Sequence, residues 1–268
     1  MRFLVLFILI MNFSLNAQVH WVKIGQGLNY GVTNNQKGND ILVTIGGWKA
    51  NQTWVNKWCE ELFNEKLKEL GVQHLISVKG PDDVCFNQKN DIDIKALAEF
   101  IKNIIYATYF IDRVIIIAHS SGSFVAHELL NFMYGEKGIA KDSFYVNKVH
   151  YFNLDGGIGG KDCGISLDTS AVKYLSKIYA VAVYDSSANL FSANYETMKR
   201  FSEMYYNKSE LMTITTTESG CVDKWCLHDV VIINKPHNPN KYDLEKDYQN
   251  FNDTRKVQTN YLNVLLKD

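Results

Sequence analysis

The stretch that decides the fold is Val114-Ile115-Ile116-Ile117-Ala118-His119-Ser120-Ser121-Gly122. Its first four residues are the most apolar β-branched run beyond the N-terminal segment, which is typical of a strand buried on both faces. A helix is expected to follow from about residue 121 to 133. A tight turn of small residues therefore joins a buried strand to a helix, and Ser120 lies within that turn.

The alternation of strand and helix continues on both sides of this stretch. Strands are expected at 19–24, 28–33, 41–45, 74–78, 114–117, 149–154, 178–184 and 211–216, and helices at 54–70, 92–109, 121–133, 195–205 and 254–266. This order predicts an α/β fold with a mostly parallel central sheet flanked by helices on both faces, and its chemistry at the carboxyl ends of the strands. Residues 18–268 contain no repeat or low-complexity linker, which indicates a single domain. The insertion between residues 157 and 178 is too short for a large cap domain.

The sequence around Ser120 fits a nucleophile elbow. A serine hydroxyl attacks only when it is exposed, rigidly held and paired with a base, and small neighbours allow the sharp turn that holds it. Gly122 satisfies the second small position of G-x-S-x-G, and Ala118 replaces the first glycine. With the order of its elements, the chain resembles the α/β-hydrolase superfamily, whose esterases and lipases carry His-Ser-x-Gly here.

The resemblance implies an oxyanion hole made by the amide of Ser121 and an amide from the turn after an earlier strand. That turn is Gly46-Gly47-Trp48, and the amide of Trp48 is favoured over that of Gly47. The glycine pair would let the backbone come close to a substrate carbonyl.

The resemblance also implies a histidine after the last strand and a carboxylate that orients it. His228 is favoured as the base because Cys221 and Cys226 can clip the segment before it, whereas His237 lies in a proline-flanked loop without such a clip. Asp185 and Asp155 each end a strand where members of the superfamily carry the acid. Asp185 leads narrowly, and both remain open.

The hypothesis is therefore a serine hydrolase that cleaves carboxylic esters through an acyl-enzyme. Trp48, Trp225 and Phe191 are expected to line an open cleft for a small-molecule, lipid or polymeric ester, with no metal or organic cofactor. One alternative is an acyltransferase with the same triad, and another is a non-catalytic binding protein on a hydrolase scaffold.

The N-terminus predicts export. Arg2 precedes an apolar run from Phe3 to Met11 and a small-residue segment ending at Ala17, which is the pattern of a signal peptide over residues 1–17. The mature protein would be secreted or periplasmic, without stable membrane insertion. The whole chain has 28 basic and 29 acidic residues and no clustered basic face, which argues against a nucleic-acid partner.

Five cysteines fit an oxidising compartment. Cys221 and Cys226 are close enough in sequence to form one bridge. Cys59 with Cys85 is a second possible pair that would leave Cys163 unpaired, although sequence alone leaves the connectivity open.

Overall fold

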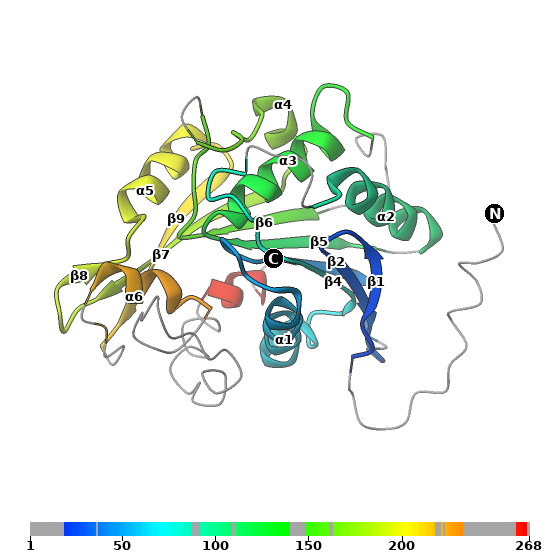
Figure 1. Cartoon of the computed structure of the whole chain (residues 1–268), viewed down its shortest axis with the longest axis horizontal. Helices are drawn as coiled ribbons and strands as arrows, with labels where there is room; N and C mark the ends of the chain where they lie inside the picture. Colours follow the sequence, from blue (N-terminus) through cyan, green and yellow to red (C-terminus); the bar gives the residue numbers. More distant parts are fainter. Residues whose placement is uncertain are drawn as a thin grey trace.

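The computed structural model describes most of the chain, shown in Figure 1. The described residues are 19–35, 37–86, 92–108, 111–139, 148–160, 163–217, 221, 223–232 and 261–266. The expected signal peptide, His237 and the first part of the expected helix 254–266 lie outside these residues.

The described strands form one nine-stranded sheet, in the order β1-β2-β4-β3-β5-β6-β7-β8, with β9 also paired to β7. The pairs β3–β4, β3–β5, β5–β6, β6–β7 and β7–β9 are parallel, whereas β1–β2, β2–β4 and β7–β8 are antiparallel. The strands are β1 (Val22–Gly25), β2 (Leu28–Val32), β3 (Asp40–Ile45), β4 (Val72–Val78), β5 (Arg113–His119), β6 (Lys148–Leu154), β7 (Lys177–Asp185), β8 (Leu190–Phe191) and β9 (Ser209–Thr216).

Helices cover both faces of the sheet, as Figure 1 shows. The apolar residues of α2 (Ile94–Ala107), α3 (Gly122–Tyr134), α4 (Thr169–Val172) and α5 (Tyr195–Met204) pack in one core. The other core contains residues of α1 (Gln52–Leu62), α6 (Lys224–Asp229) and the short 3₁₀-helix η4 (Asn263–Leu266). The central strands β3 and β5 are almost completely buried between these two layers, which explains their continuous apolar runs. The predicted α/β fold with a mostly parallel sheet is confirmed.

Three differences between the predicted and the observed elements are the clearest. The helix expected at 54–70 is α-helical only to Leu62 and continues as the π-helix η2 (Phe63–Leu67). The short strand β8 turns back on β7 and was not expected. The segment with His228 was expected to be a loop, but it forms helix α6, whose N-cap residue Asp223 accepts hydrogen bonds from the amides of Trp225 and Cys226.

The cysteine pairing corrects one expectation. Cys221 pairs with Cys226, as expected, but Cys85 pairs with Cys163, 78 residues away, and not with Cys59. Cys59 is a free thiol buried on α1. The pairing of Cys59 with Cys85 was therefore wrong, because α1 buries the Cys59 side chain whereas Cys85 lies in a loop between β4 and α2.

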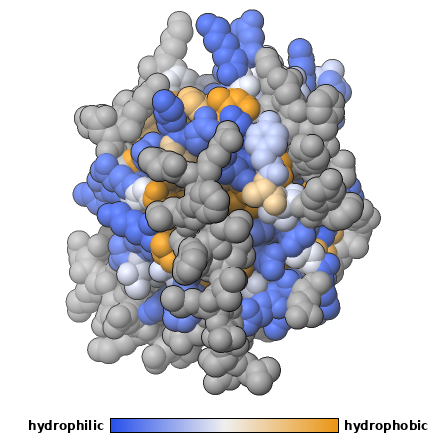
Figure 2. Space-filling view, turned by 90° about the vertical axis from the view of Figure 1, so that its right-hand side faces the viewer, coloured by the Kyte–Doolittle hydropathy of each residue, from blue (hydrophilic) through white to orange (hydrophobic). Residues whose placement is uncertain are grey.

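One face of the molecule is mixed in character. Figure 2 faces the side of the molecule that carries β1 and α2, where hydrophilic side chains surround small hydrophobic areas. Within the described residues, the structure has no helix with the length and apolarity needed to cross a membrane.

Candidate active site

Ser120 lies at the tip of the turn between β5 and α3. Its φ is +54°, in the left-handed region that residues other than glycine rarely occupy. The turn is held from both sides, because the Ser120 amide donates to the carbonyl of Leu154 at 3.1 Å and its carbonyl accepts from the amide of Ser123 at 3.0 Å. A strained backbone that its surroundings hold in place is typical of a nucleophile elbow, and the Ser120 residue remains partly exposed.

The turn after β3 lies directly against this serine. A Cβ atom added to Gly47 would lie 3.1 Å from the Cβ atom of Ser120 and 2.9 Å from Nδ1 of His119, so glycine favours this close approach. Within the described part of the chain, the amides of Trp48 and Ser121 donate no hydrogen bond. Two N–H donors are thus available beside Ser120, which is what an oxyanion hole requires.

His228 is paired with Asp155. The Nδ1–H of His228 donates to Oδ2 of Asp155 at 2.6 Å, and both side chains are buried. The same carboxylate accepts from the hydroxyl of Ser192 at 2.7 Å and from the amide of Asn194 at 3.2 Å. These donors fix the orientation of the carboxylate, and the bond to Nδ1 leaves Nε2 of a neutral His228 as the proton acceptor.

Asp185 is held in a different way. Its carboxylate accepts from the amide and the hydroxyl of Ser187, at 2.9 and 2.6 Å, and from the amide of Ala188 at 3.2 Å. These bonds close the turn that follows β7. Of the two carboxylates named from the sequence, the structure therefore brings Asp155 to His228 and engages Asp185 in its own turn.

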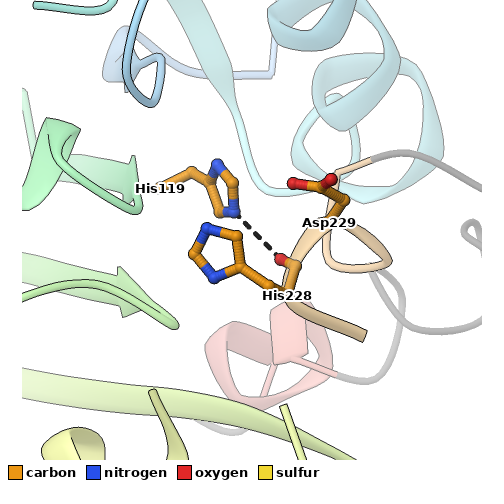
Figure 3. Close-up of side chains that lie close together, drawn as sticks. All are labelled: His119, His228 and Asp229. Carbon is orange, nitrogen blue, oxygen red and sulfur yellow. Dashed lines mark hydrogen bonds between the residues drawn. The ribbon is translucent and has the colours of Figure 1, made fainter. Parts of the chain in front are cut away.

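His119 and His228 lie against each other at the elbow (Figure 3). Their ring centroids are 4.6 Å apart, and Nε2 of His119 lies 3.0 Å from the carbonyl oxygen of His228. Because a carbonyl only accepts, this nitrogen must carry the proton. The contact ties α6 to the residue that immediately precedes Ser120.

Burial and neighbouring charges shift the pKa values of these two rings in opposite directions. Burial lowers the pKa of His119 to about 4, so His119 is neutral at pH 7. Burial also lowers the pKa of His228, but the hydrogen bond and charge of Asp155, together with the charge of Asp229, outweigh it and raise this pKa above its usual value. Protonated His228 is thus stabilised where it would form during proton transfer.

One group of described side chains could hold a metal ion, namely His119, His228 and Asp229, whose donor atoms lie within 4.8 Å of one another. The donor set is only partly suited to this task. Nδ1 of His228 and Nε2 of His119 already donate hydrogen bonds, and Nδ1 of His119 lies where a Cβ atom on Gly47 would approach it to 2.9 Å. A metal would need Nε2 of His228, the same atom that a catalytic base uses.

The aromatic residues expected to line the site are among the exposed large hydrophobic residues. Trp225, 47% exposed, meets the ring of His228 edge-on with centroids 5.6 Å apart. Trp48, 52% exposed, donates through Nε1 to the carbonyl of Asp82. Phe191 is also exposed and lies on β8, which contacts α6. Of the three, Trp225 has the most direct contact with the site.

Sequence reasoning missed the residues that orient Asp155. Ser192 and Asn194 reach it only because β8 folds back against β7, and no motif in the sequence marks that return. It also treated His119 as part of the elbow alone and did not name Asp229. A usable signal for Asp229 was its position directly after His228.

Comparison with solved structures identifies the fold. Two crystal structures of esterase B from Lactobacillus rhamnosis are similar to this chain. The first, described with a C4-C4 SN3 tributyrin phosphonate inhibitor, has a TM-score of 0.51 at 9% sequence identity and covers 93% of this chain and 89% of that chain. The second, inhibited by a C6-C4 SN3 compound, has a TM-score of 0.50 at 8% identity and covers 93% and 90%.

An esterase from Pyrococcus furiosus aligns with a TM-score of 0.47 at 13% identity, over 78% of this chain and 86% of that chain. Neither a protein-family model nor a curated protein sequence matches this chain. At such low identity the two esterase B structures establish the fold, and the chain has the α/β-hydrolase fold. The resemblance inferred from the sequence is confirmed at that level.

Proposed function

We propose that this protein is a serine hydrolase that cleaves carboxylic esters through an acyl-enzyme. The observation that carries the proposal is the 2.6 Å bond from His228 to the buried Asp155, with His228 also held against His119, the residue before a serine at positive φ. In this proposal Ser120 is the nucleophile, His228 the base and Asp155 the acid of a catalytic triad.

The reaction follows from these roles. Nε2 of His228 takes the hydroxyl proton of Ser120 as the oxygen attacks the ester carbonyl, and Asp155 stabilises the imidazolium that forms. The negative charge that develops on the carbonyl oxygen is held by the amides of Ser121 and Trp48. The imidazolium then gives its proton to the leaving alcohol. Water, activated by the same histidine, releases the acid from Ser120 in a second round.

The surroundings favour an accessible ester. Among the described residues between β6 and β7, the only helix is the four-residue α4, so no large cap is built over the site from this segment. Trp225 and Trp48 offer exposed apolar surface for the acyl or alcohol part of a substrate. The phosphonate named for esterase B of Lactobacillus rhamnosis mimics the tetrahedral intermediate of ester hydrolysis, and it is a reasonable first inhibitor to test.

Secretion is part of the same proposal. The N-terminal pattern of residues 1–17 suits export, and two disulfides suit an oxidising compartment. The N-terminal residue of protein purified from a culture medium or periplasm would test cleavage after Ala17.

A fluorophosphonate probe tests the enzymatic part without knowledge of the substrate, because it reacts only with an activated serine. We expect labelling of the wild type, none of Ser120→Ala and almost none of His228→Ala. Ser186→Ala is the matched control, since Ser186 is an exposed serine in the turn after β7, and it should be labelled normally. A folded wild-type protein that the probe does not label would refute the proposal and support a binding protein instead.

A panel of p-nitrophenyl esters from acetate to dodecanoate would then define the acyl preference. Product analysis with added acceptor alcohols separates hydrolysis from acyl transfer, because a transferase would form a new ester rather than the free acid.

A further inference from the structure

We propose that Asp229 is a second carboxylate for His228, a positioning residue that favours the protonated imidazole during acyl transfer. The inference rests on the proposed function and adds Asp229 as a fourth residue to the triad of Ser120, His228 and Asp155. Asp229 is 8% exposed, and one of its carboxylate oxygens lies within 4.8 Å of donor atoms of His228 and His119. Figure 3 shows its carboxylate pointing toward the two imidazole rings, whose planes are tilted by 41°.

Helix α6 places this carboxylate. Asp223 caps its first turn, and the bridge from Cys221 to Cys226 closes the segment just before His228. His228 and Asp229 are the last two residues of α6, and the amide of Ile232 donates to the carbonyl of Asp229 at 2.9 Å. His228 and Asp229 are therefore held on one short helix, with bonds at its first and last turns.

The charges around His228 all favour its protonation. Asp155 approaches from the end of β6, and Asp229 from α6 itself. His119, from the end of β5, stays neutral because burial lowers its pKa to about 4. The carboxylate of Asp185, at the end of β7, is turned into its own loop. Two carboxylates thus face one imidazole that becomes positively charged in the reaction.

The proposal requires the negative charge of Asp229 and not only the space that its side chain fills, and substitutions can separate the two. A unit charge about 5 Å away shifts a pKa by about 0.6 units in bulk water and by about 2.4 units at an effective dielectric constant of about 20, so a shift of the order of one unit is expected. Asp229→Asn should therefore lower the pKa of His228 by about one unit, because the charge that favours the imidazolium is removed. Asp229→Glu retains the charge and should restore most of that shift.

Two measurements test this. NMR titration of the His228 ring gives its pKa directly and needs no turnover. The pH profile of fluorophosphonate labelling should show the acidic limb of Asp229→Asn displaced to lower pH by the same amount, with a plateau about threefold to tenfold lower because the base is weaker. At low pH, below both pKa values, the Asp229→Asn profile would then meet or exceed the wild-type profile, which a general loss of structure does not produce.

Asp82→Asn is the control, since it removes the same charge from an exposed side chain in the loop after β4. It should move the pKa of His228 by less than about 0.2 units because water and salt screen it. An Asp229→Asn protein with an unchanged His228 pKa would overturn the inference. A wild type that titrates as expected but is never labelled would refute the proposed function and the catalytic role of Asp229 with it, while leaving the electrostatic result intact.

Discussion

Replacement of Asp155 by asparagine is the most direct test of the candidate triad. The carboxylate has three donors around it, with Oδ1 accepting from Ser192 and Oδ2 accepting from Asn194 and His228. Asparagine keeps the shape but has only one acceptor oxygen. Its amide nitrogen must therefore face either Ser192 or the other two donors.

The orientation of the asparagine side-chain amide sets the size of the expected loss of activity in Asp155→Asn. If the amide nitrogen occupies the Oδ2 position, it opposes the Nδ1–H of His228 and drives the ring to the tautomer that cannot accept a proton from Ser120, a loss of about 10⁴-fold. If it occupies the Oδ1 position, His228 keeps its tautomer and loses the carboxylate charge, a loss of roughly 10²-fold from a charge-assisted bond. We therefore expect a decrease in labelling rate and kcat/KM of between about 10² and 10⁴.

Asp185→Asn is the matched comparison, because Asp185 also ends a strand and is equally buried. Three hydrogen bonds of its carboxylate lie within its own turn, so activity should stay within about threefold of the wild type, with a lower Tm from the weakened turn. The assay is the rate of fluorophosphonate labelling at matched folded fraction, followed by hydrolysis of the best p-nitrophenyl ester. Retained activity in Asp155→Asn with loss in Asp185→Asn would reverse the assignment and refute the geometric argument.

Three further outcomes are expected. Gly80→Ala should lose at least about 2 kcal/mol of stability and much of its labelling, because a Cβ atom there would lie 1.6 Å from the carbonyl oxygen of Gly47. Thermal unfolding beside Gly25→Ala checks this, since the nearest atom to that Cβ would be the end of the Leu28 side chain at 2.9 Å. The free energy of unfolding, measured with urea, should fall by roughly several kcal/mol between pH 7.5 and 4.5. Burial lowers the pKa of His74, His119 and His127 to about 4 in the folded protein. As pH falls below about 6.5, these histidines therefore take up protons only in the unfolded chain, which favours unfolding. A free energy of unfolding that does not change with pH would contradict this expectation. Replacing Cys85 and Cys163 by serine should lower the free energy of unfolding by about 4 kcal/mol, and replacing Cys221 and Cys226 by about 2 kcal/mol, because the first bridge closes a much longer loop. Equal losses measured by urea unfolding would contradict this dependence on loop length.

The fold could be predicted because its strongest signals are local. The apolar runs at 41–45 and 114–117 are buried on both faces by helices, and such runs have few alternatives to a central parallel strand. The elbow at Ser120 was equally visible, since its chemistry depends on immediate neighbours. The predicted helix at 54–70 was less accurate, because a π-helical segment replaces regular α-helix after Leu62.

The features that escaped prediction depend on contacts between distant segments. The bridge between Cys85 and Cys163 joins the loop after β4 to the loop after β6, and nothing in the sequence marks their proximity. Helix α6 is only six residues long, too short for a hydrophobic period to reveal it. Its N-cap, Asp223, was the available local signal, because aspartate often precedes a helix.

The register of the sheet explains why Asp155 is suited to act with Ser120. His119 lies opposite Leu154 in the parallel ladder of β5 and β6, so the next residues, Ser120 and Asp155, emerge side by side, and both have positive φ. The amide of Ser120 donates to the carbonyl of Leu154, which couples the two turns mechanically. Two of the three hydrogen bonds to the Asp155 carboxylate come from Ser192 and Asn194, which follow β8. The third comes from His228. The ring and the carbonyl of His228 also contact His119, the residue just before Ser120, so the base is held at the turn that carries the serine.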